Sequence, residues 1–179
     1  MSARERLDRL EHEYSDIQTH LPYLRDVVIE RNAQHVIELG TRTGVSTVAF
    51  LAGLESTGGR LTSIDIEPGP DLGEQPQWTF IQSDDLDPRL IGRLDPADIV
   101  FIDTSHHYNH TAAELRIYSQ LIRRPGLILC HDVELRNPLG APPFPPFPVR
   151  RAVIDVAAAE GWSWHIRPGS FGLAVIEVL

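Results

Sequence analysis

Short apolar runs alternate along the chain with stretches in which apolar residues return every three or four positions. The runs have the length of buried strands, and the stretches have the period of helices. The expected strands are 36–39, 61–64, 78–81, 97–102, 127–130, 162–166 and 173–178, and the helices between them are 45–54, 86–94, 111–121 and 150–160. This alternation predicts an α/β fold with a Rossmann-like, doubly wound, seven-stranded sheet. The sheet is expected to be mostly parallel, with an antiparallel last strand because only a reverse turn at 167–170 precedes it.

A region of different pattern precedes the first strand. Residues 1–33 carry Leu7, Leu10, Tyr14 and Ile17 at helical spacing, and the pattern restarts near residue 22, which predicts two N-terminal helices. These helices can pack on the sheet, cover the open end of a site or pair with a second subunit. Packing on the sheet is the favoured interpretation.

A second such region, residues 137–149, contains six prolines and two phenylalanines. Proline at this density excludes a helix or a central strand. We expect a stiff loop over the substrate side of a site, with the phenylalanines as an apolar wall. A proline-rich spacer or a partner-docking segment is the alternative.

Length and composition narrow the class of protein. The 179 residues fit a single domain, and the formal charge of −9 opposes a nucleic-acid partner, so a small-molecule substrate is expected. No apolar run reaches the ~20 residues of a membrane span, and the charged N-terminus is unlike a signal peptide, which predicts a cytoplasmic protein. All 16 basic residues are arginine, which excludes a lysine base or Schiff base. The single cysteine, Cys130, is expected in the core.

The clearest chemical signal is the glycine loop between the first strand and its helix. Gly40 and Gly44 let the backbone approach a ligand, and the following helix presents its N-terminus to a negative charge. Arg42 stands where a dinucleotide fingerprint needs its middle glycine, which disfavours a pyrophosphate ligand. Asp65 ends the next strand and can accept hydrogen bonds from two ribose hydroxyls. The stretch predicts a nucleoside site, and a tight turn required by helix packing is the alternative.

Polar residues also follow the later strands. Asp103 comes directly after the fourth strand, and His131 and Asp132 come after the fifth. Open α/β sheets bind ligands at the carboxyl ends of their strands, so these three side chains are expected at one crevice. Ser83 and Asp84, after the third strand, can line the same crevice or cap the next helix.

Four motifs in this order carry a family resemblance, namely IELGTRTGVST, TSIDIEP, DIVFIDTSHHY and LILCHD. Together they resemble class I S-adenosylmethionine-dependent methyltransferases, in particular the small bacterial O-methyltransferases grouped with macrocin and cephalosporin-tailoring enzymes, and more distantly the catechol O-methyltransferases. The resemblance, from about Thr19 to the end, implies methyl transfer from S-adenosylmethionine to a small-molecule hydroxyl. The implied cofactor-binding residues are Glu38, Gly40, Thr41, Gly44, Ser46, Asp65, Ile66, Ser83, Asp84 and Asp103.

The resemblance also implies a metal site. In metal-dependent relatives, acidic residues after the fourth and fifth strands bind Mg²⁺, which lowers the pKa of the acceptor hydroxyl. Asp103, His131 and Asp132 stand at those places. The histidine replaces an acid of neighbouring relatives, and Val133 replaces an asparagine of the catechol enzymes, so a softer divalent ion and a metal-free site both stay open.

The proposed catalytic base is His106, with Asp103 beside it. Catechol enzymes carry a lysine base three residues after the metal aspartate, and His106 stands there. A histidine, with an ordinary pKa near 6.5, suits a base at neutral pH. His107 is the neighbouring candidate, and the structural alternative is that both histidines only shape the turn after Asp103.

Two other functions fit the same fold. One is a non-catalytic nucleoside-binding or scaffold domain. The other is an NAD-dependent dehydrogenase, which Arg42 disfavours. Under the methyltransferase interpretation the acceptor can be a sugar, a phenol or a polyketide, and the N-terminal helices are compatible with a homodimer.

Overall fold

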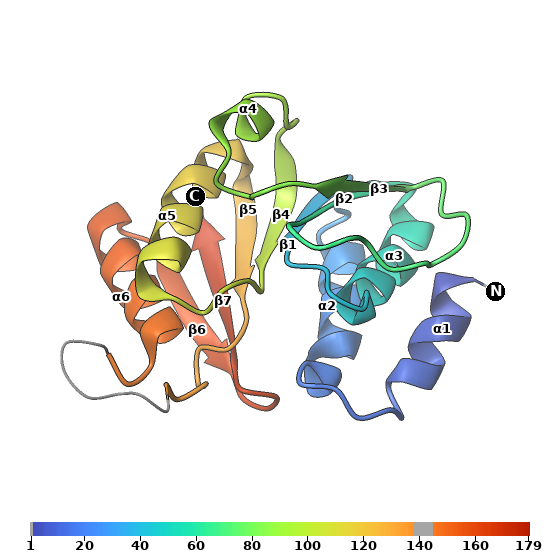
Figure 1. Cartoon of the computed structure of the whole chain (residues 1–179), viewed down its shortest axis with the longest axis horizontal. Helices are drawn as coiled ribbons and strands as arrows, with labels where there is room; N and C mark the ends of the chain where they lie inside the picture. The colour runs from blue at the N-terminus through green and yellow to red at the C-terminus, as the bar shows by residue number, and fades with distance from the viewer. Residues whose placement is uncertain (1, 138–144) are drawn as a thin grey trace.

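The computed structural model describes residues 2–137 and 145–179, which contain a seven-stranded sheet (Figure 1). Its strand order is β3-β2-β1-β4-β5-β7-β6. The strands are β1 His35–Leu39, β2 Arg60–Asp65, β3 Trp78–Gln82, β4 Ala97–Ile102, β5 Ile122–Cys130, β6 Ser163–Arg167 and β7 Leu173–Val178. β7 pairs antiparallel with β5 and β6, and the remaining described pairs are parallel. The predicted Rossmann-like sheet with an antiparallel last strand is confirmed.

Helices cover both faces of this sheet (Figure 1). They are α1 Ala3–Leu10, α2 Leu21–Glu30, α3 Val45–Thr57, α4 Pro88–Ile91, α5 Tyr108–Tyr118 and α6 Pro148–Glu160, with 3-10 turns η1 Gln18–His20 and η2 Ser119–Leu121. α1 and α2 pack against α3 on one face, and α5 and α6 pack together on the other. The N-terminal helices therefore join the layer on the sheet, which was the favoured interpretation. Within the described ranges, no helix is long and apolar enough to cross a membrane.

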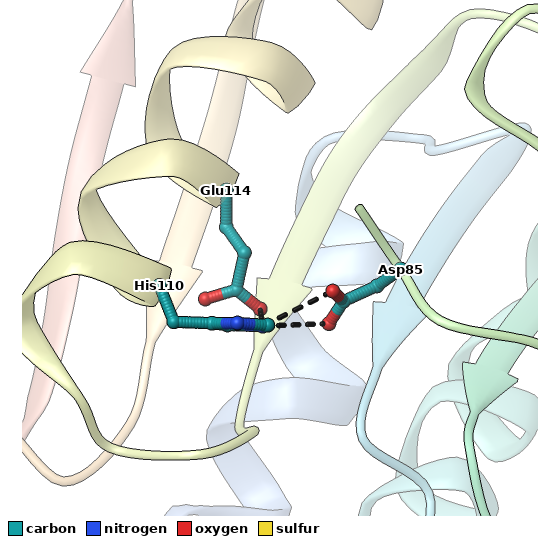
Figure 2. A group of neighbouring side chains, drawn as sticks. All are labelled: Asp85, His110 and Glu114. Carbon is teal, nitrogen blue, oxygen red and sulfur yellow. Dashed lines mark hydrogen bonds and ion pairs between the residues drawn. The ribbon is translucent and has the colours of Figure 1, made fainter. Parts of the chain in front are cut away.

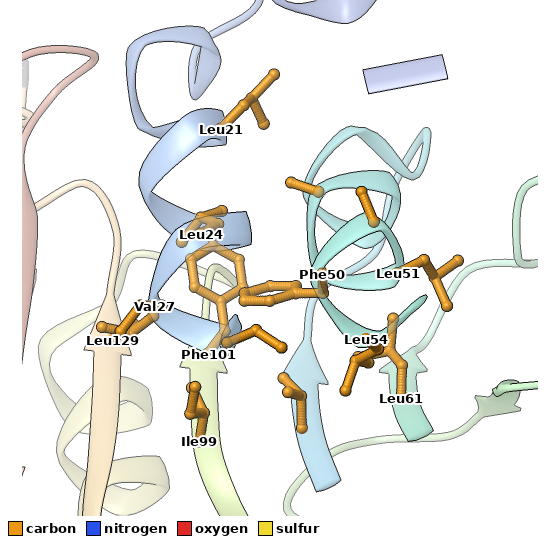
Figure 3. Close-up of a cluster of buried hydrophobic side chains, with 14 of the residues drawn as sticks. Leu21, Leu24, Val27, Phe50, Leu51, Leu54, Leu61, Ile99, Phe101 and Leu129 are labelled. Carbon is orange, nitrogen blue, oxygen red and sulfur yellow. The ribbon is translucent and has the colours of Figure 1, made fainter. Parts of the chain in front are cut away.

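Alternate residues of the central strands supply two apolar cores. Phe101 of β4 faces α2 and α3, where its ring lies 5.3 Å from that of Phe50 (Figure 3). Val100 and Ile102 face α5 and α6 in the second core, which also contains Cys130 as predicted. Burial on both faces explains why β4 is apolar at every position except Asp98.

The topology brings the carboxyl ends of four strands to one edge. β1 lies between β2 and β4, so the strand order reverses beside β1. Leu39 aligns with Ile64 on one side and with Ile102 on the other, and Ile102 aligns with Cys130. The residues that follow these strands therefore meet above one crevice, as is usual where the order of an open sheet reverses.

The end of α1 and the start of β5 differ from the prediction. α1 ends at Leu10, and the polar segment after it is not helical, so Tyr14 is 92% exposed and does not extend the apolar stripe. β5 begins at Ile122, five residues earlier than expected, because Ile122 pairs with Ala97 before a shift in register. Pro125 and Gly126, which precede the expected strand 127–130, therefore lie within β5, at its irregular register.

The proline-rich region lies largely outside the described residues, which omit 138–144. Of its two phenylalanines, Phe147 is described and directly precedes α6, with its ring centre 5.4 Å from the guanidinium carbon of Arg150. The apolar wall over the substrate side stays a prediction.

Candidate functional site

The glycine loop is built around two close approaches. At Gly40, with φ of +83°, a Cβ would lie 1.9 Å from the carbonyl oxygen of Asp103. At Gly44, also at +83°, it would lie 2.9 Å from Cγ of Pro70. Only glycine fits both the left-handed conformation and the space, so the loop after β1 can lie directly against the end of β4.

Asp65 holds this loop in place. Its Oδ2 accepts hydrogen bonds from the backbone N–H groups of Thr41 (2.7 Å) and Arg42 (2.9 Å), and its Oδ1 accepts one from Glu67 (2.9 Å). Partial burial acts to raise the pKa of Asp65, but these hydrogen bonds outweigh it and leave the pKa below its ordinary value. An ionised carboxylate has about four acceptor sites, so Asp65 keeps capacity for ribose hydroxyls while it supports the loop.

Glu38 lies beneath the loop and is wholly buried. Its carboxyl group accepts hydrogen bonds from the hydroxyls of Ser46 (2.6 Å), Thr47 (2.8 Å) and Ser63. Burial raises its pKa to about 7, although the three hydroxyl donors act to lower it. Glu38 therefore links β1, β2 and α3 and lines neither of the cavities described next, which favours a supporting role over contact with a ligand.

Two adjoining cavities open at this edge of the sheet. The first, of about 400 Å³, lies between the glycine loop and the segment from Tyr14 to Ile17. The second, of about 370 Å³, lies at the ends of β2, β3 and β4. They share Gly40, Arg42 and Asp103. Of the predicted cofactor residues, the first cavity is lined by Gly40, Thr41, Ser46 and Asp103, and the second by Gly40, Asp65, Ile66, Ser83, Asp84 and Asp103.

Ser83 and Asp84 do not cap the next helix. Asp87 does, by accepting a hydrogen bond from the N–H of Arg89 (2.9 Å), and Pro88 takes the first helical position, where no N–H is needed. This late cap explains why α4 is shorter than the predicted 86–94. Asp84 instead accepts a hydrogen bond from the N–H of Leu86 (2.8 Å), which shapes the loop while both predicted residues line the second cavity.

The residues after β4 and β5 form a compact Asp/His cluster, defined here as Asp103, His106, His131 and Asp132. One ligand atom from each of Asp103, His131 and Asp132 lies within 4.8 Å of the others. Nε2 of His106 lies 2.8 Å from Oδ2 of Asp132 and 3.4 Å from Oδ1 of Asp103. His106 and Asp132 both have positive φ, at 55° and 61°, which is uncommon for residues other than glycine.

His131 is oriented as a metal-binding histidine would be. Its Nε2 donates to the carbonyl oxygen of Ser170 (2.6 Å), so Nδ1 faces the carboxylates, 3.2 Å from Asp132 and 3.5 Å from Asp103. Within the described residues this buried Nδ1 has no hydrogen-bond partner of acceptable geometry. A ring held by a carbonyl on one nitrogen and facing two carboxylates with the other could bind a divalent ion.

The histidines and carboxylates of the cluster shift one another's pKa values. Burial acts to lower the pKa of His131, but Asp103 and Asp132 raise it to about 10. The same two carboxylates raise the pKa of His106 to about 9. Burial acts to raise the pKa of Asp132, but the two histidines outweigh it and hold that pKa below its ordinary value. When no other cation is bound, both imidazoles are therefore protonated at neutral pH.

Sequence reasoning missed a second cluster, formed by Asp85, His110 and Glu114. His110 and Glu114 are four residues apart on α5 and so share a helix face, which was the available signal. Asp85 and His110 line the second cavity, where the predicted Ser83 and Asp84 also lie.

The segment before η1 lines the first cavity, in agreement with the alternative in which the N-terminal region covers the open end of a site. Oδ2 of Asp16 lies 2.6 Å from Nη1 of Arg42, which ties the segment to the glycine loop. Farther along, Nε2 of His20 donates to the carbonyl oxygen of Gly169 (2.8 Å), and burial lowers the pKa of His20 to about 4, so the ring is neutral. The turn between β6 and β7 is thus held by His20 on one side and by His131 on the other.

Comparison with known families identifies the central segment. The family described as "Methyltransferase domain" matches residues 37–133, more than half of the chain. The match includes the glycine loop, Asp65, Asp103 and the His131–Asp132 pair. Among curated proteins, none matches the chain in sequence.

Solved structures share the fold over nearly the whole chain. An O-methyltransferase from Bacillus cereus, in complex with S-adenosylhomocysteine, has a TM-score of 0.67 at 17% identity, covering 99% of this chain and 90% of that one. TomG of Streptomyces achromogenes, an O-methyltransferase of tomaymycin synthesis in complex with S-adenosylmethionine, has a TM-score of 0.68 at 15% identity, covering 99% and 90%. MycE of the mycinamycin pathway, in complex with Mg, S-adenosylhomocysteine and mycinamycin VI, has a TM-score of 0.73 at 16% identity, covering 96% of this chain and 53% of that one.

Proposed function

The chain belongs to this family of methyltransferase domains, and from that premise we propose that it transfers a methyl group from S-adenosylmethionine to a hydroxyl of a small molecule. The observation that carries the proposal is the pair of cavities that meet at Gly40 and Asp103, with the Asp/His cluster beside them. One cavity suits the methionine end and the other suits the adenosine. The solved relatives bound to S-adenosylmethionine or its product support this assignment.

Charge favours this crevice as the position of the cofactor. Asp65 is ionised and lies in the second cavity, where it can accept hydrogen bonds from ribose hydroxyls. Asp84 lines the same cavity and can accept one from the adenine amino group. Asp103 borders both cavities and is ionised because its histidine neighbours outweigh its burial, so it lies where a sulfonium would be stabilised.

The Asp/His cluster would serve the acceptor. Asp103, His131 and Asp132 would hold a divalent cation, which when bound lowers the pKa of an acceptor hydroxyl. His106 would remove the acceptor's proton, which requires its neutral form. Because Asp103 and Asp132 are the groups that raise the pKa of His106, any charge that neutralises them also makes this base available. The Mg in the MycE complex supports a metal-assisted reaction.

Calorimetry tests the cofactor site. Wild-type protein is expected to bind S-adenosylhomocysteine, and Asp65→Ala should weaken binding at least tenfold, because it removes both the ribose acceptor and the support of the glycine loop. The matched control is Glu74→Ala, an exposed residue in the loop after β2 that lies outside both cavities. Absence of binding by the wild type at millimolar ligand would overturn the proposal, and tight NAD binding would favour a dehydrogenase.

Turnover tests the base. With an acceptor found by screening sugars, phenols and polyketides, His106→Ala should lower turnover by roughly 10²-fold or more and leave S-adenosylhomocysteine affinity unchanged. His107→Ala is the comparison, since His107 precedes α5 without a side-chain cap. If only His107→Ala loses turnover, the catalytic base is His107 and not His106.

Three further predictions belong with this proposal. We propose a cytoplasmic enzyme that acts on a small molecule, and its formal charge of −9 supports the absence of a nucleic-acid partner. A homodimer stays a prediction, although α1 and α2 pack on α3 within the chain. Light scattering of the purified protein would measure its mass in solution.

A further inference from the structure

Asp85, His110 and Glu114 are not among the residues assigned to methyl transfer, although Asp85 and His110 line the second cavity. Asp85 comes from the loop after β3, and His110 and Glu114 come from α5, so the three side chains meet across two elements (Figure 2). Nε2 of His110 lies 3.1 Å from Oδ1 of Asp85 and 3.6 Å from Oε1 of Glu114. One ligand atom of each residue lies within 4.8 Å of the other two.

The carboxylates of this cluster are buried without enough donors. Glu114 is wholly buried, and its one described hydrogen bond is accepted by Oε1 from the hydroxyl of Thr104 (2.8 Å). Among the described residues, Oε2 of Glu114 and Oδ1 of Asp85 have no hydrogen-bond partner of acceptable geometry. Two buried carboxylates that share one imidazole need a further positive charge, which either a proton or a metal ion can supply.

The spacing of these atoms suits a metal ion. Ligand atoms at ~2.0–2.2 Å from a tetrahedral zinc lie roughly 3.4 Å from one another. The observed separations of 3.1 and 3.6 Å lie on either side of that value. We propose that Asp85, His110 and Glu114 bind a divalent transition-metal ion, for which zinc is the reference, at a site separate from the Asp/His cluster.

The proposed ion can reach this site from the second cavity, and its binding would link the loop after β3 to α5. Asp85 and His110 line the second cavity, and the His110 side chain is 28% exposed, so the ion can enter from that cavity. The backbone carbonyl of Asp85 accepts a hydrogen bond from the Tyr118 hydroxyl (2.7 Å), which already fixes the loop to the far end of α5. A bound ion would fix the same loop to the first half of α5, beside the proposed adenosine end of the cofactor site.

Zinc stoichiometry of the whole protein tests the site, with Zn²⁺ alone as the probe. Protein dialysed against excess zinc and then against metal-free buffer is measured by mass spectrometry of the metal. We expect one zinc to be lost on His110→Ala and on Glu114→Gln, the latter nearly isosteric. His131→Ala removes any zinc held by the Asp/His cluster, and His165→Ala, an exposed histidine of β6, is the control that should lose none.

The outcomes separate the two sites. The new site is supported if His131→Ala retains zinc and the double variant His110→Ala/His131→Ala loses it. This result does not require that the Asp/His cluster binds a metal. Zinc should also raise the melting temperature of His131→Ala and leave that of the double variant unchanged. Equal zinc content in wild type and His110→Ala would overturn the proposal and would mean that a proton neutralises Glu114. If Glu114→Gln does not fold, the zinc content of His110→Ala still tests the site.

Discussion

At Gly40 the constraint is steric as well as conformational, which makes the residue a sharp test of the loop. Gly40→Ala would bring a Cβ to 1.9 Å from the carbonyl oxygen of Asp103, so β1 and β4 would have to separate. We expect a loss of stability of about 3 kcal/mol or more, from combined overpacking and left-handed strain, together with loss of S-adenosylhomocysteine binding. Urea denaturation and calorimetry measure the two effects.

Gly58→Ala is the matched control for that substitution. Gly58 has φ of +71°, but a Cβ added there would have nothing within 4 Å of it, so the variant tests the conformation without the clash. We expect a cost of about 1 kcal/mol and unchanged ligand binding. Equal losses in the two variants would show that close approach to Asp103 is unimportant.

The raised pKa of Glu38 predicts that the free energy of unfolding depends on pH. Its pKa is about 7 in the folded protein and near 4.5 when unfolded. The neutral form is therefore favoured by folding, so its stabilising contribution is full below pH 4.5 and is lost as pH rises through 7. The shift corresponds to about 3 kcal/mol over this window.

Glu38→Gln should remove that dependence. The difference in unfolding free energy between wild type and variant, measured in urea at pH 4.5 and pH 8, should change in favour of the variant as the pH rises. Glu160→Gln, at the exposed end of α6, should show no such trend. A constant difference for Glu38→Gln would mean that the pKa of Glu38 is the same in the folded and unfolded protein.

Sequence reasoning worked best for residues whose place follows from topology. Asp103, His131 and Asp132 come together because β4 and β5 are parallel neighbours, which the pattern of runs predicts. The hydrogen bonds from the glycine loop to Asp65 could not be predicted from the sequence. A carboxylate at the end of this strand can face a ligand or support a loop, and the sequence is the same in both cases. Asp85 was missed because its contact with α5 depends on how that helix is rotated on the sheet.

At the scale of elements, the turn between β6 and β7 connects the N-terminal part of the chain to the Asp/His cluster. Its Gly169 has φ of +107°, and a Cβ there would lie 2.5 Å from the hydroxyl of Thr19. Gly169→Ala should displace the turn and with it the Ser170 carbonyl that orients His131. We expect divalent-ion affinity of the cluster to fall roughly 10- to 100-fold, although no ligand is changed.

This prediction is measured by zinc titration in the Glu114→Gln background, so that the second cluster is not counted. Gly161→Ala, at φ of +72° with open space around it, is the control with a similar backbone and no clash. Unchanged affinity in Gly169→Ala would show that His131 does not depend on the turn.

The elements themselves were largely predictable, and the errors share one cause. Strands and long helices follow from periodic burial, which the sequence records directly. α1, α4 and the start of β5 depend instead on caps and on a register shift, which are decided by contacts with other elements. Tyr14 shows the result, since its spacing fits a helical stripe while the helix ends four residues earlier.

For the whole molecule, ligand binding should appear as thermal stability. A ligand at about 100 times its dissociation constant stabilises the folded state by about 2.7 kcal/mol. For a chain of 179 residues this corresponds to a rise in melting temperature of roughly 5–10 °C. S-adenosylhomocysteine should produce this rise in the wild type and a smaller one in Asp65→Ala, whereas NADH should produce none.

The acidic lining of the crevice bears on how the enzyme would turn over. Asp65, Asp84 and Asp103 face the proposed cofactor position, and methyl transfer converts a sulfonium cation into an uncharged thioether. The carboxylates attract the positive charge of S-adenosylmethionine but not the uncharged S-adenosylhomocysteine. The reaction itself therefore promotes release of this product. Competition experiments should find weak product inhibition at low ionic strength, and added salt should narrow the gap between the two affinities.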